Sequence, residues 1–299
     1  MSDGSKLKRI RESLALNTLD ASSQRRLRYI VIGFLVLLVP AVLWGLHEFY
    51  PVGADWESAF FPAMRHFREP YDVYYFTSPP WALPLLPHAL LDLQWSNAIN
   101  MCLNILALAA LIWRYKGGAF AFILTFTSPI FLKLAHANNI DWLPTLAFLI
   151  PPMWGLPLLA LKPQVLGGAA LIWWKKRRFS PWMLAPLAGV VILSLVIWGF
   201  WLPDVNGLPA DADLWNFAPW PFGIPAGIYL IYRAWQKDDE ILAAAATPFF
   251  VPYFGVHSLA PLLALLACKY RREAIYLYAG FWFYLIVESR RLALIVPAG

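Results

Sequence analysis

Residues 29–46 read YIVIGFLVLLVPAVLWGL, an apolar run of 18 residues without a charged side chain. Its length is close to the roughly 20 residues that a helix needs to cross a bilayer. The run follows a basic segment that contains SKLKRIRES and QRRLR, and it ends in the bulky HEFYP rather than in a small-residue cleavage site. We therefore expect an uncleaved first membrane span after a cytoplasmic basic tail, residues 1–28. We expect this tail to lie beside anionic lipid, with a nucleic-acid-binding arm as the alternative.

The composition of the whole chain agrees with a membrane protein. Hydrophobic residues make up 60% of the 299 positions and charged residues only 14%, whereas roughly a quarter of the residues in soluble domains are charged. The two cysteines, Cys102 and Cys268, stand alone in apolar runs, which argues against a disulfide framework or a cysteine metal site. No dinucleotide-binding, Walker or zinc-protease motif is present, so those chemistries have no support.

Further apolar stretches follow the first one along the chain. They lie at 95–113, 118–134, 142–174, 181–202, 219–235, 241–268 and 274–298. Residues 142–174 and 241–268 are too long for one span and contain several prolines, so we expect each to cross in short pieces. We predict an all-α polytopic membrane protein, with a transmembrane domain over residues 29–299 and roughly 8–10 spanning segments, some of them broken helices. Broken helices line a cavity or are buried in protein; kinks within packed helices are the alternative.

Basic residues mark one side of the predicted membrane domain. Clusters at Arg114, 175–178, Arg233 and 269–272 fall between apolar stretches and, with the basic tail, hold most of the 24 Lys and Arg residues. The positive-inside rule places these turns and the N-terminus in the cytoplasm. The opposite, outer side then receives the first loop, residues 50–94, which we expect to carry interfacial or re-entrant helices.

This first loop carries the most distinctive pattern in the chain. Residues 51–91 read PVGADWESAFFPAMRHFREPYDVYYFTSPPWALPLLPHALL, which places Asp55 just beyond the first span. A Pro-Tyr-Asp turn, an aromatic cluster and a Pro-Pro-initiated apolar helix follow it. The later motifs are HANNID at 136–141, LKPQ at 161–164 and TPFFVPY at 247–253, followed by His257.

In their order these motifs resemble the GT-C superfamily of membrane glycosyltransferases, and most closely its polyprenyl-phosphate-mannose-dependent mannosyltransferases. The resemblance runs over residues 29–268, with His136-Ala137 in place of a Gly-Gln pair and His257 where many relatives carry Asp. It implies a GT-C-like fold in a bacterial inner (plasma) membrane with the active face outside. It also implies inverting transfer of a sugar, a mannose-like hexose first of all, from a polyprenyl-phosphate donor to a lipid or glycan acceptor.

Such a transfer needs a base for the acceptor hydroxyl and a cation for the departing phosphate. A carboxylate at the water–lipid boundary suits the first role, which we assign to Asp55, with helix N-capping as the alternative. Lys162, alone at a helix break, and His257 are the candidates for binding the donor phosphate. Snorkelling of Lys162 to the head groups, and a purely structural His257 between helices, are the alternatives.

Other residues are candidates for binding the substrates. Asn138, Asn139 and Asp141 suit hydrogen bonds to sugar hydroxyls, with an Asn-rich tight turn as the alternative. The aromatic residues of the first loop suit stacking on a sugar, with an interfacial aromatic belt as the alternative. The remaining candidates are Glu57 as a substitute base, Arg65 for substrate or lipid head groups, Tyr71, Asp72, Tyr75, His136 and Gln164. The sequence identifies no cofactor and leaves a divalent metal open.

A different class of function stays open beside the enzyme. A non-enzymatic lipid or solute transporter, or a membrane scaffold subunit, is the alternative. A transporter is expected to pair broken helices in corresponding halves and to hold ionisable groups near the middle of the membrane. Here the acidic and histidine residues of the predicted outer segments gather on one side of the membrane, which favours the enzyme. The expected partners are the polyprenyl-phosphate-sugar donor, membrane lipids and a lipid or glycan acceptor, and no nucleic acid.

Overall fold

The computed structural model describes residues 38–206 and 216–295. Every regular element in these two ranges is a helix, as the composition predicts. The chain divides into two units, residues 1–48 and 49–299. The described part of the first unit belongs to the apolar helix Leu38–Phe49. The expected basic tail and the first half of the expected first span lie outside the described residues.

Two helical stretches among the described residues are long and apolar enough to cross a membrane. They are α4 (Leu93–Arg114) and Pro181–Trp198, which contains α11 (Ala185–Trp198). A third span exists if α5 (Gly118–Phe126) and α6 (Pro129–Ala137), bent by 57° at their break, count as one. The described residues thus form an all-α fold with two or three candidate membrane helices. These are fewer than the apolar stretches suggest, because most of the other helices are shorter than a membrane span.

Prolines divide the two longest apolar stretches into these short helices. The first stretch forms α7 (Trp142–Leu146), α8 (Pro152–Leu159), α9 (Pro163–Leu166) and α10 (Ala169–Lys176). The second forms α13 (Glu240–Ala246), η9 (Thr247–Phe249), η10 (Val256–Leu259) and α14 (Ala260–Lys269). A proline occupies one of the first two positions of α8, α9, η9 and α14, where the missing N–H breaks no helical hydrogen bond. The prolines therefore set where several of these helices begin.

The first loop folds into a series of single-turn and two-turn helices. They are η2 (Trp56–Phe60), α3 (Phe61–Arg65), η3 (Pro70–Asp72), η4 (Pro80–Leu85) and η5 (Pro87–Leu90). Trp56 is fully buried and its indole stacks on the His88 imidazole with ring centroids 5.0 Å apart. The loop thus has an apolar core of its own, and none of its helices is long enough to cross a bilayer.

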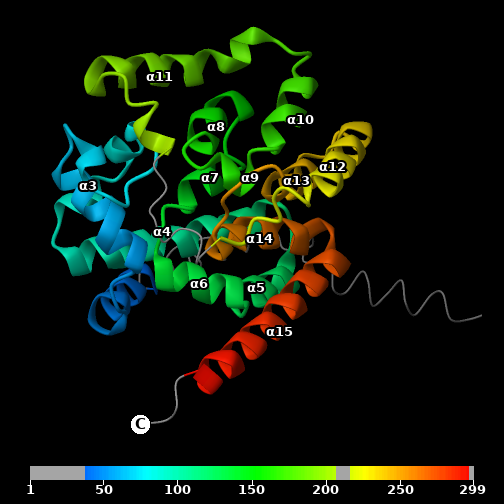
Figure 1. Cartoon of the computed structure of the whole chain (residues 1–299), viewed down its shortest axis with the longest axis horizontal. Coiled ribbons are helices and arrows are strands. Elements are labelled where there is room, and N and C mark those ends of the chain that lie inside the picture. Colours follow the sequence, from blue (N-terminus) through cyan, green and yellow to red (C-terminus); the bar gives the residue numbers. More distant parts are fainter. Residues whose placement is uncertain (1–37, 207–215, 296–299) are drawn as a thin grey trace, which may run out of the picture. The chain divides into compact units, whose positions relative to one another are not determined.

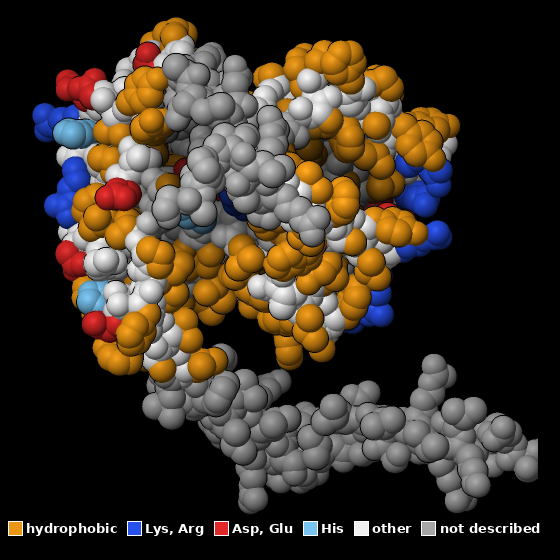
Figure 2. Space-filling view, turned by 60° about the horizontal axis from the view of Figure 1, so that its bottom comes forward, with side chains coloured by type: hydrophobic (Ala, Val, Ile, Leu, Met, Phe, Trp, Pro, Cys, Tyr) orange, Lys and Arg blue, Asp and Glu red, His pale blue; other side chains and the backbone are white. Residues whose placement is uncertain are grey.

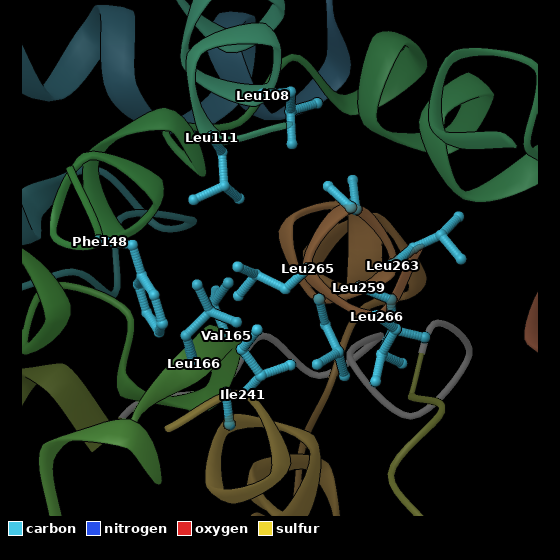
Figure 3. Packing of buried hydrophobic residues seen from close by; sticks show 14 of the residues in the cluster. Leu108, Leu111, Phe148, Val165, Leu166, Ile241, Leu259, Leu263, Leu265 and Leu266 are labelled. Carbon is cyan, nitrogen blue, oxygen red and sulfur yellow. The ribbon is translucent and has the colours of Figure 1, made fainter. Parts of the chain in front are cut away.

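The main core forms around α14, which lies in the middle of the helices labelled in Figure 1. Its apolar residues 262–267 are buried on every side of the helix, as expected for a central helix. Figure 3 shows Leu263, Leu265 and Leu266 of α14 facing side chains from several other helices. These partners are Leu108 and Leu111 of α4, Phe148 after α7, Val165 and Leu166 of α9, and Ile241 of α13.

Other helices turn apolar side chains outward. On α11, Val196 is 78% exposed, and on α15 (Arg271–Ile295) Phe283 is 70% exposed. A soluble protein rarely leaves such continuous apolar surface in water. Figure 2 shows hydrophobic side chains over much of one face of the molecule, with a group of basic side chains at the right-hand edge of the view. These surfaces suit contact with lipid.

Helix α4 runs from the first loop to the basic clusters. Its 22 residues correspond to a length of about 33 Å, enough for a hydrocarbon core of ~30 Å. Asp92 caps its first turn beside the first loop, and Arg114 ends it. Next to that end, a Cβ on Gly117 would lie 2.5 Å from Cys268 Sγ of α14, one residue before Lys269. Basic residues that we expected in the cytoplasm therefore lie near the end of α4 remote from the first loop.

Further ion pairs gather more of the basic residues at that end. Lys175 and Lys176 of α10 pair with Asp238 and Glu240, which flank the start of α13. Between these two acids, Asp239 pairs with Lys269 at the end of α14. The intervening helix α12 (Ile224–Lys237) ends at the same turn. One end of the 49–299 unit is thus basic, as the positive-inside reading of the sequence predicts.

Candidate functional site

Asp55 lies at the start of the first loop's leading helix, η2, with 35% of its side chain exposed. Its carboxylate makes no capping hydrogen bond, so the capping alternative does not describe this residue. Instead, Asp55 Oδ2 accepts a hydrogen bond from Asn139 Nδ2 at 2.5 Å. The two segments approach closely because residue 53 is glycine: a Cβ there would lie 2.2 Å from Asn138 Cβ.

The turn after α6 presents Asn139 to Asp55. Asn138 ends the helix in the left-handed conformation, with φ of 49°, which Asn adopts more easily than most residues. Its buried side chain is directed to α4, where Nδ2 donates to Asn97 Oδ1 at 2.6 Å and Oδ1 accepts from Asn100 Nδ2 at 3.0 Å. The Asn-rich turn that we considered is therefore present, and Asn138 serves its structure.

Lys162 lies at the break between α8 and α9. Pro163 disfavours the helical conformation for the residue before it, and Lys162 is extended, with φ of −142° and ψ of 72°. Its Nζ donates to Asp141 Oδ1 at 2.5 Å, to Asn139 Oδ1 at 2.9 Å and to Ser258 Oγ at 3.4 Å. An ammonium group has three N–H donors, so each of them faces an acceptor. Lys162 is 5% exposed; it does not snorkel, and its counter-ion is Asp141.

His257 completes the cluster from η10. Its Nε2 lies 3.7 Å from Asp55 Oδ2 and 3.9 Å from Asp141 Oδ2, just beyond hydrogen-bond distance of both. Asp141 is 1% exposed, and its Oδ2 has no hydrogen-bond partner among the described residues. With His257 neutral, two carboxylates and one ammonium leave the cluster with a net negative charge. A shift of about 1 Å would let a protonated imidazole donate to either carboxylate.

Helix α4 supports this cluster with residues that our reading of the sequence did not select. Asn97, Asn100 and Asn104 recur at helical spacing on one buried face, with Ser96 beside them. Asn100 Oδ1 accepts from Trp142 Nε1 at 2.9 Å. The signal was present in the sequence, because three asparagines within a predicted membrane span are costly unless they have a role.

Ser258 was also missed. It follows His257 and provides the third acceptor for Lys162. Serine is common between short helices, and nothing in its local sequence separates it from a capping or packing residue.

The other predicted site residues make none of the hydrogen bonds or ion pairs that hold this cluster together. Arg65 Nη2 donates to Leu91 O at 2.7 Å, and its guanidinium lies over the Phe61 ring. Tyr71 OH donates to Ser78 O at 3.0 Å; burial, with the charge of Asp204 adding to it, raises the pKa of Tyr71. The exposed candidates are Glu57, Asp72, Tyr75 and His136, and Gln164 is half-buried on α9.

No metal-binding group was found: the described residues contain no set of three or more His, Cys, Asp or Glu side chains arranged to hold a metal ion. Comparison with protein-family models, with curated proteins and with solved structures found no match to this chain. A function is therefore argued from the cluster and from the motifs that carry it.

Proposed function

We propose that this chain is a membrane glycosyltransferase of the GT-C type. It transfers a sugar, a mannose-like hexose in the first instance, from a polyprenyl-phosphate donor to a lipid or glycan acceptor at the outer face of the plasma membrane. The observation that carries the proposal is the setting of Asp55. This partly exposed carboxylate lies at the edge of a buried polar cluster that also holds Lys162 and His257.

The proposed chemistry is a single inverting displacement. Asp55 accepts the proton of the acceptor hydroxyl while the new bond forms between that oxygen and the anomeric carbon. The bond from the anomeric carbon to the phosphate oxygen breaks, and the phosphate leaves with the electron pair. Asn139 holds Asp55 through its amide N–H, which leaves the second carboxylate oxygen, Oδ1, to receive the proton.

Two nitrogen donors, on His257 and Lys162, face the departing phosphate in this proposal. His257 Nε2 is the more accessible of them, with 19% of its side chain exposed. Lys162 is held by three acceptors, of which Ser258 Oγ at 3.4 Å is the most distant. A phosphate oxygen would replace that contact first, while Asp141 and Asn139 keep the ammonium in place. Positioned charge of this kind lowers the barrier because it faces the charge that develops on the leaving group.

The proposed topology follows from α4. The cluster lies beside the first turns of this helix, through Asn97 and Asn100. The basic end of the unit adjoins the last turns, near Gly117 and Cys268. We therefore place the first loop outside and the basic end in the cytoplasm. The full number of spans, roughly eight to ten, includes the proline-divided stretches, whose short helices cross in pieces.

The decisive experiment measures sugar transfer from polyprenyl-phosphate sugars by the purified protein and its Asp55→Asn variant. A positioned base contributes a factor of about 10²–10⁴, so the variant should lose about 3–5 kcal/mol of barrier lowering and keep its thermal stability. The matched control is Glu69→Gln, an exposed carboxylate of the same loop, which should stay active. Full activity of Asp55→Asn would refute the assignment.

One observation favours the alternative of a transporter. The buried Asp141–Lys162 pair is a charged couple inside an apolar protein, and such pairs also serve ion and proton pathways. A transporter would show no transfer with any polyprenyl-phosphate sugar. It would instead move a solute or protons across liposomes in a way that Asp141→Asn abolishes. A glycosyltransferase would release the sugar from its phosphate without a transmembrane gradient.

A further inference from the structure

The polar face of α4 indicates that this helix has a role in the site in addition to the roles assigned in the proposed chemistry. Membrane-spanning helices rarely carry several amides, because each one must find a hydrogen-bond partner in a medium without water. Asn97, Asn100 and Asn104 are all at most 1% exposed. Their amide hydrogen bonds run mainly to the two chain segments that carry Asp55 and Asn139.

Asn97 forms hydrogen bonds to both of these segments. Its Oδ1 accepts from Gly53 N–H at 3.0 Å and from Asn138 Nδ2 at 2.6 Å. Its Nδ2 donates to Pro51 O at 3.2 Å, and its own backbone oxygen accepts from Asn138 Nδ2 at 2.8 Å. One buried amide therefore fixes the segment that leads into Asp55 and the segment that leads into Asn139.

Asn104 offers an internal comparison on the same face. Its Nδ2 donates to Asn139 O at 2.7 Å and to Asn100 O at 3.2 Å. Asn139 O also accepts from Asn100 Nδ2 at 3.3 Å, so the loss of Asn104 leaves that oxygen with a partner. Asn104 touches only one of the two segments, whereas Asn97 touches both.

We propose that Asn97 is a positioning residue of the site: it holds the Asp55 segment against the Asn139 turn, and so sets the hydrogen bond through which Asn139 orients Asp55. Its kinetic consequence rests on the proposed function, but its geometric consequence does not. A base displaced by about 1 Å costs on the order of 10²-fold in rate. The effect should fall on kcat rather than on KM, because Asn97 lies behind the cluster and touches no substrate.

The geometric test is cross-linking between the two segments and needs no activity. Ala54 and His136 are both exposed. They are the sequence neighbours of Gly53 and Ala137, whose backbones approach each other closely. Cysteines at these two positions, in a chain whose native cysteines are replaced by alanine, react with a short bifunctional thiol reagent. The yield of the linked product with time is read by mass spectrometry.

Two variants are compared in that background. Asn97→Leu, which removes all of the side-chain bonds, should slow the cross-linking strongly. Asn104→Leu, which removes an amide of equal burial from the same helix, should leave its rate unchanged. If leucine at 97 prevents folding, Asn97→Ser is used, because its shorter hydroxyl does not span both Gly53 and Asn138, and the same slowing is expected.

The outcomes separate the two proposals. Unchanged cross-linking in a folded position-97 variant overturns the positioning role. Asn97-dependent cross-linking in a protein that transfers no sugar refutes the proposed function and keeps the geometric role. In an active protein, equal losses of kcat in Asn97→Leu and Asn104→Leu at equal thermal stability also overturn the inference, since they would report a general effect of burying leucine on α4.

Discussion

Two buried aspartates, each paired with a lysine, lie in different regions of the 49–299 unit and differ in how fully they are bonded. Asp239, at the basic end, caps α13 through Ile241 N–H and Leu242 N–H and accepts from Lys269 at 2.7 Å and from Tyr270 OH. Both of its oxygens have partners. Asp141, in the polar cluster, pairs with Lys162 through Oδ1, and its buried Oδ2 has no hydrogen-bond partner among the described residues.

This difference separates a structural carboxylate from one with unused capacity. Buried polar atoms are nearly always hydrogen-bonded in native proteins, so an unsatisfied one needs an explanation. The lysines differ in the same sense: the Lys162 side chain is 7% exposed, and that of Lys269 is 51% exposed. At the basic end, the Asp239–Lys269 pair joins helices and remains in contact with solvent. In the polar cluster, the Asp141–Lys162 pair is desolvated, and a substrate or a proton can bind the free oxygen of Asp141.

The largest expected effect on stability is that of Lys162→Met. Removal of one partner of a buried ion pair leaves an uncompensated charge, which costs about 3–5 kcal/mol. The double variant Lys162→Met/Asp141→Leu should recover most of this loss, because no buried charge then remains at either position. Chemical unfolding of the purified protein measures both values. A single variant as stable as the wild type would show that Asp141 is not held as an anion.

A smaller loss is expected from Asp239→Ala. The change removes the α13 cap, for which about 0.5–2 kcal/mol is typical, together with the acceptor for Lys269. The variant should lose stability but keep its affinity for a donor, because Asp239 lies away from the polar cluster. Unfolding and donor-binding measurements on the same preparation test this. A weakened donor affinity would contradict the separation of the two regions.

The sequence predicted much of what surrounds these two regions. The all-α class follows from long apolar runs with little charge, and the helix breaks follow from prolines such as Pro152 and Pro163. Asp55, Asn139, Asp141, Lys162 and His257 were selected from four separate motifs, and the structure brings them into one cluster. Motifs that are separate in the sequence can be predicted to lie together when the helices that carry them end on the same side of the bundle.

The sequence did not predict how the charges within that cluster are arranged. The pairing of Lys162 with Asp141 depends on where α9 packs against the turn after α6, which is a tertiary contact. The same holds for Asn97, whose partners Gly53 and Asn138 are remote in the sequence. Most first-loop candidates were chosen by residue type alone, and residue type does not say which side of a short helix faces the site.

A more modest effect is expected on the pH dependence of stability, through Asp239. Burial raises the pKa of Asp239, but the hydrogen bonds from Lys269 and Tyr270 and the backbone outweigh it, so its pKa lies below the ordinary value. A carboxyl whose pKa is lowered on folding adds stability above its unfolded pKa of about 3.9, and that stability is lost as the pH falls through the folded pKa. Unfolding between about pH 5 and pH 3 should therefore show a smaller pH dependence in Asp239→Asn than in the wild type. Equal slopes would contradict it.

The smallest effect is expected from Lys269→Ala, the counterpart of Lys162→Met at the basic end. The Lys269 ammonium keeps most of its hydration, and after its removal Asp239 retains Tyr270 OH and two backbone N–H donors. The loss should stay at or below about 1 kcal/mol, as for other exposed pairs, and it should shrink further in high salt. Lys162→Met should be insensitive to salt, because buried charges are screened little. Unfolding of both variants at low and high salt measures the contrast directly. If Lys269→Ala cost as much as Lys162→Met, burial would not be what distinguishes the two pairs, and the unused capacity of Asp141 would lose its physical basis.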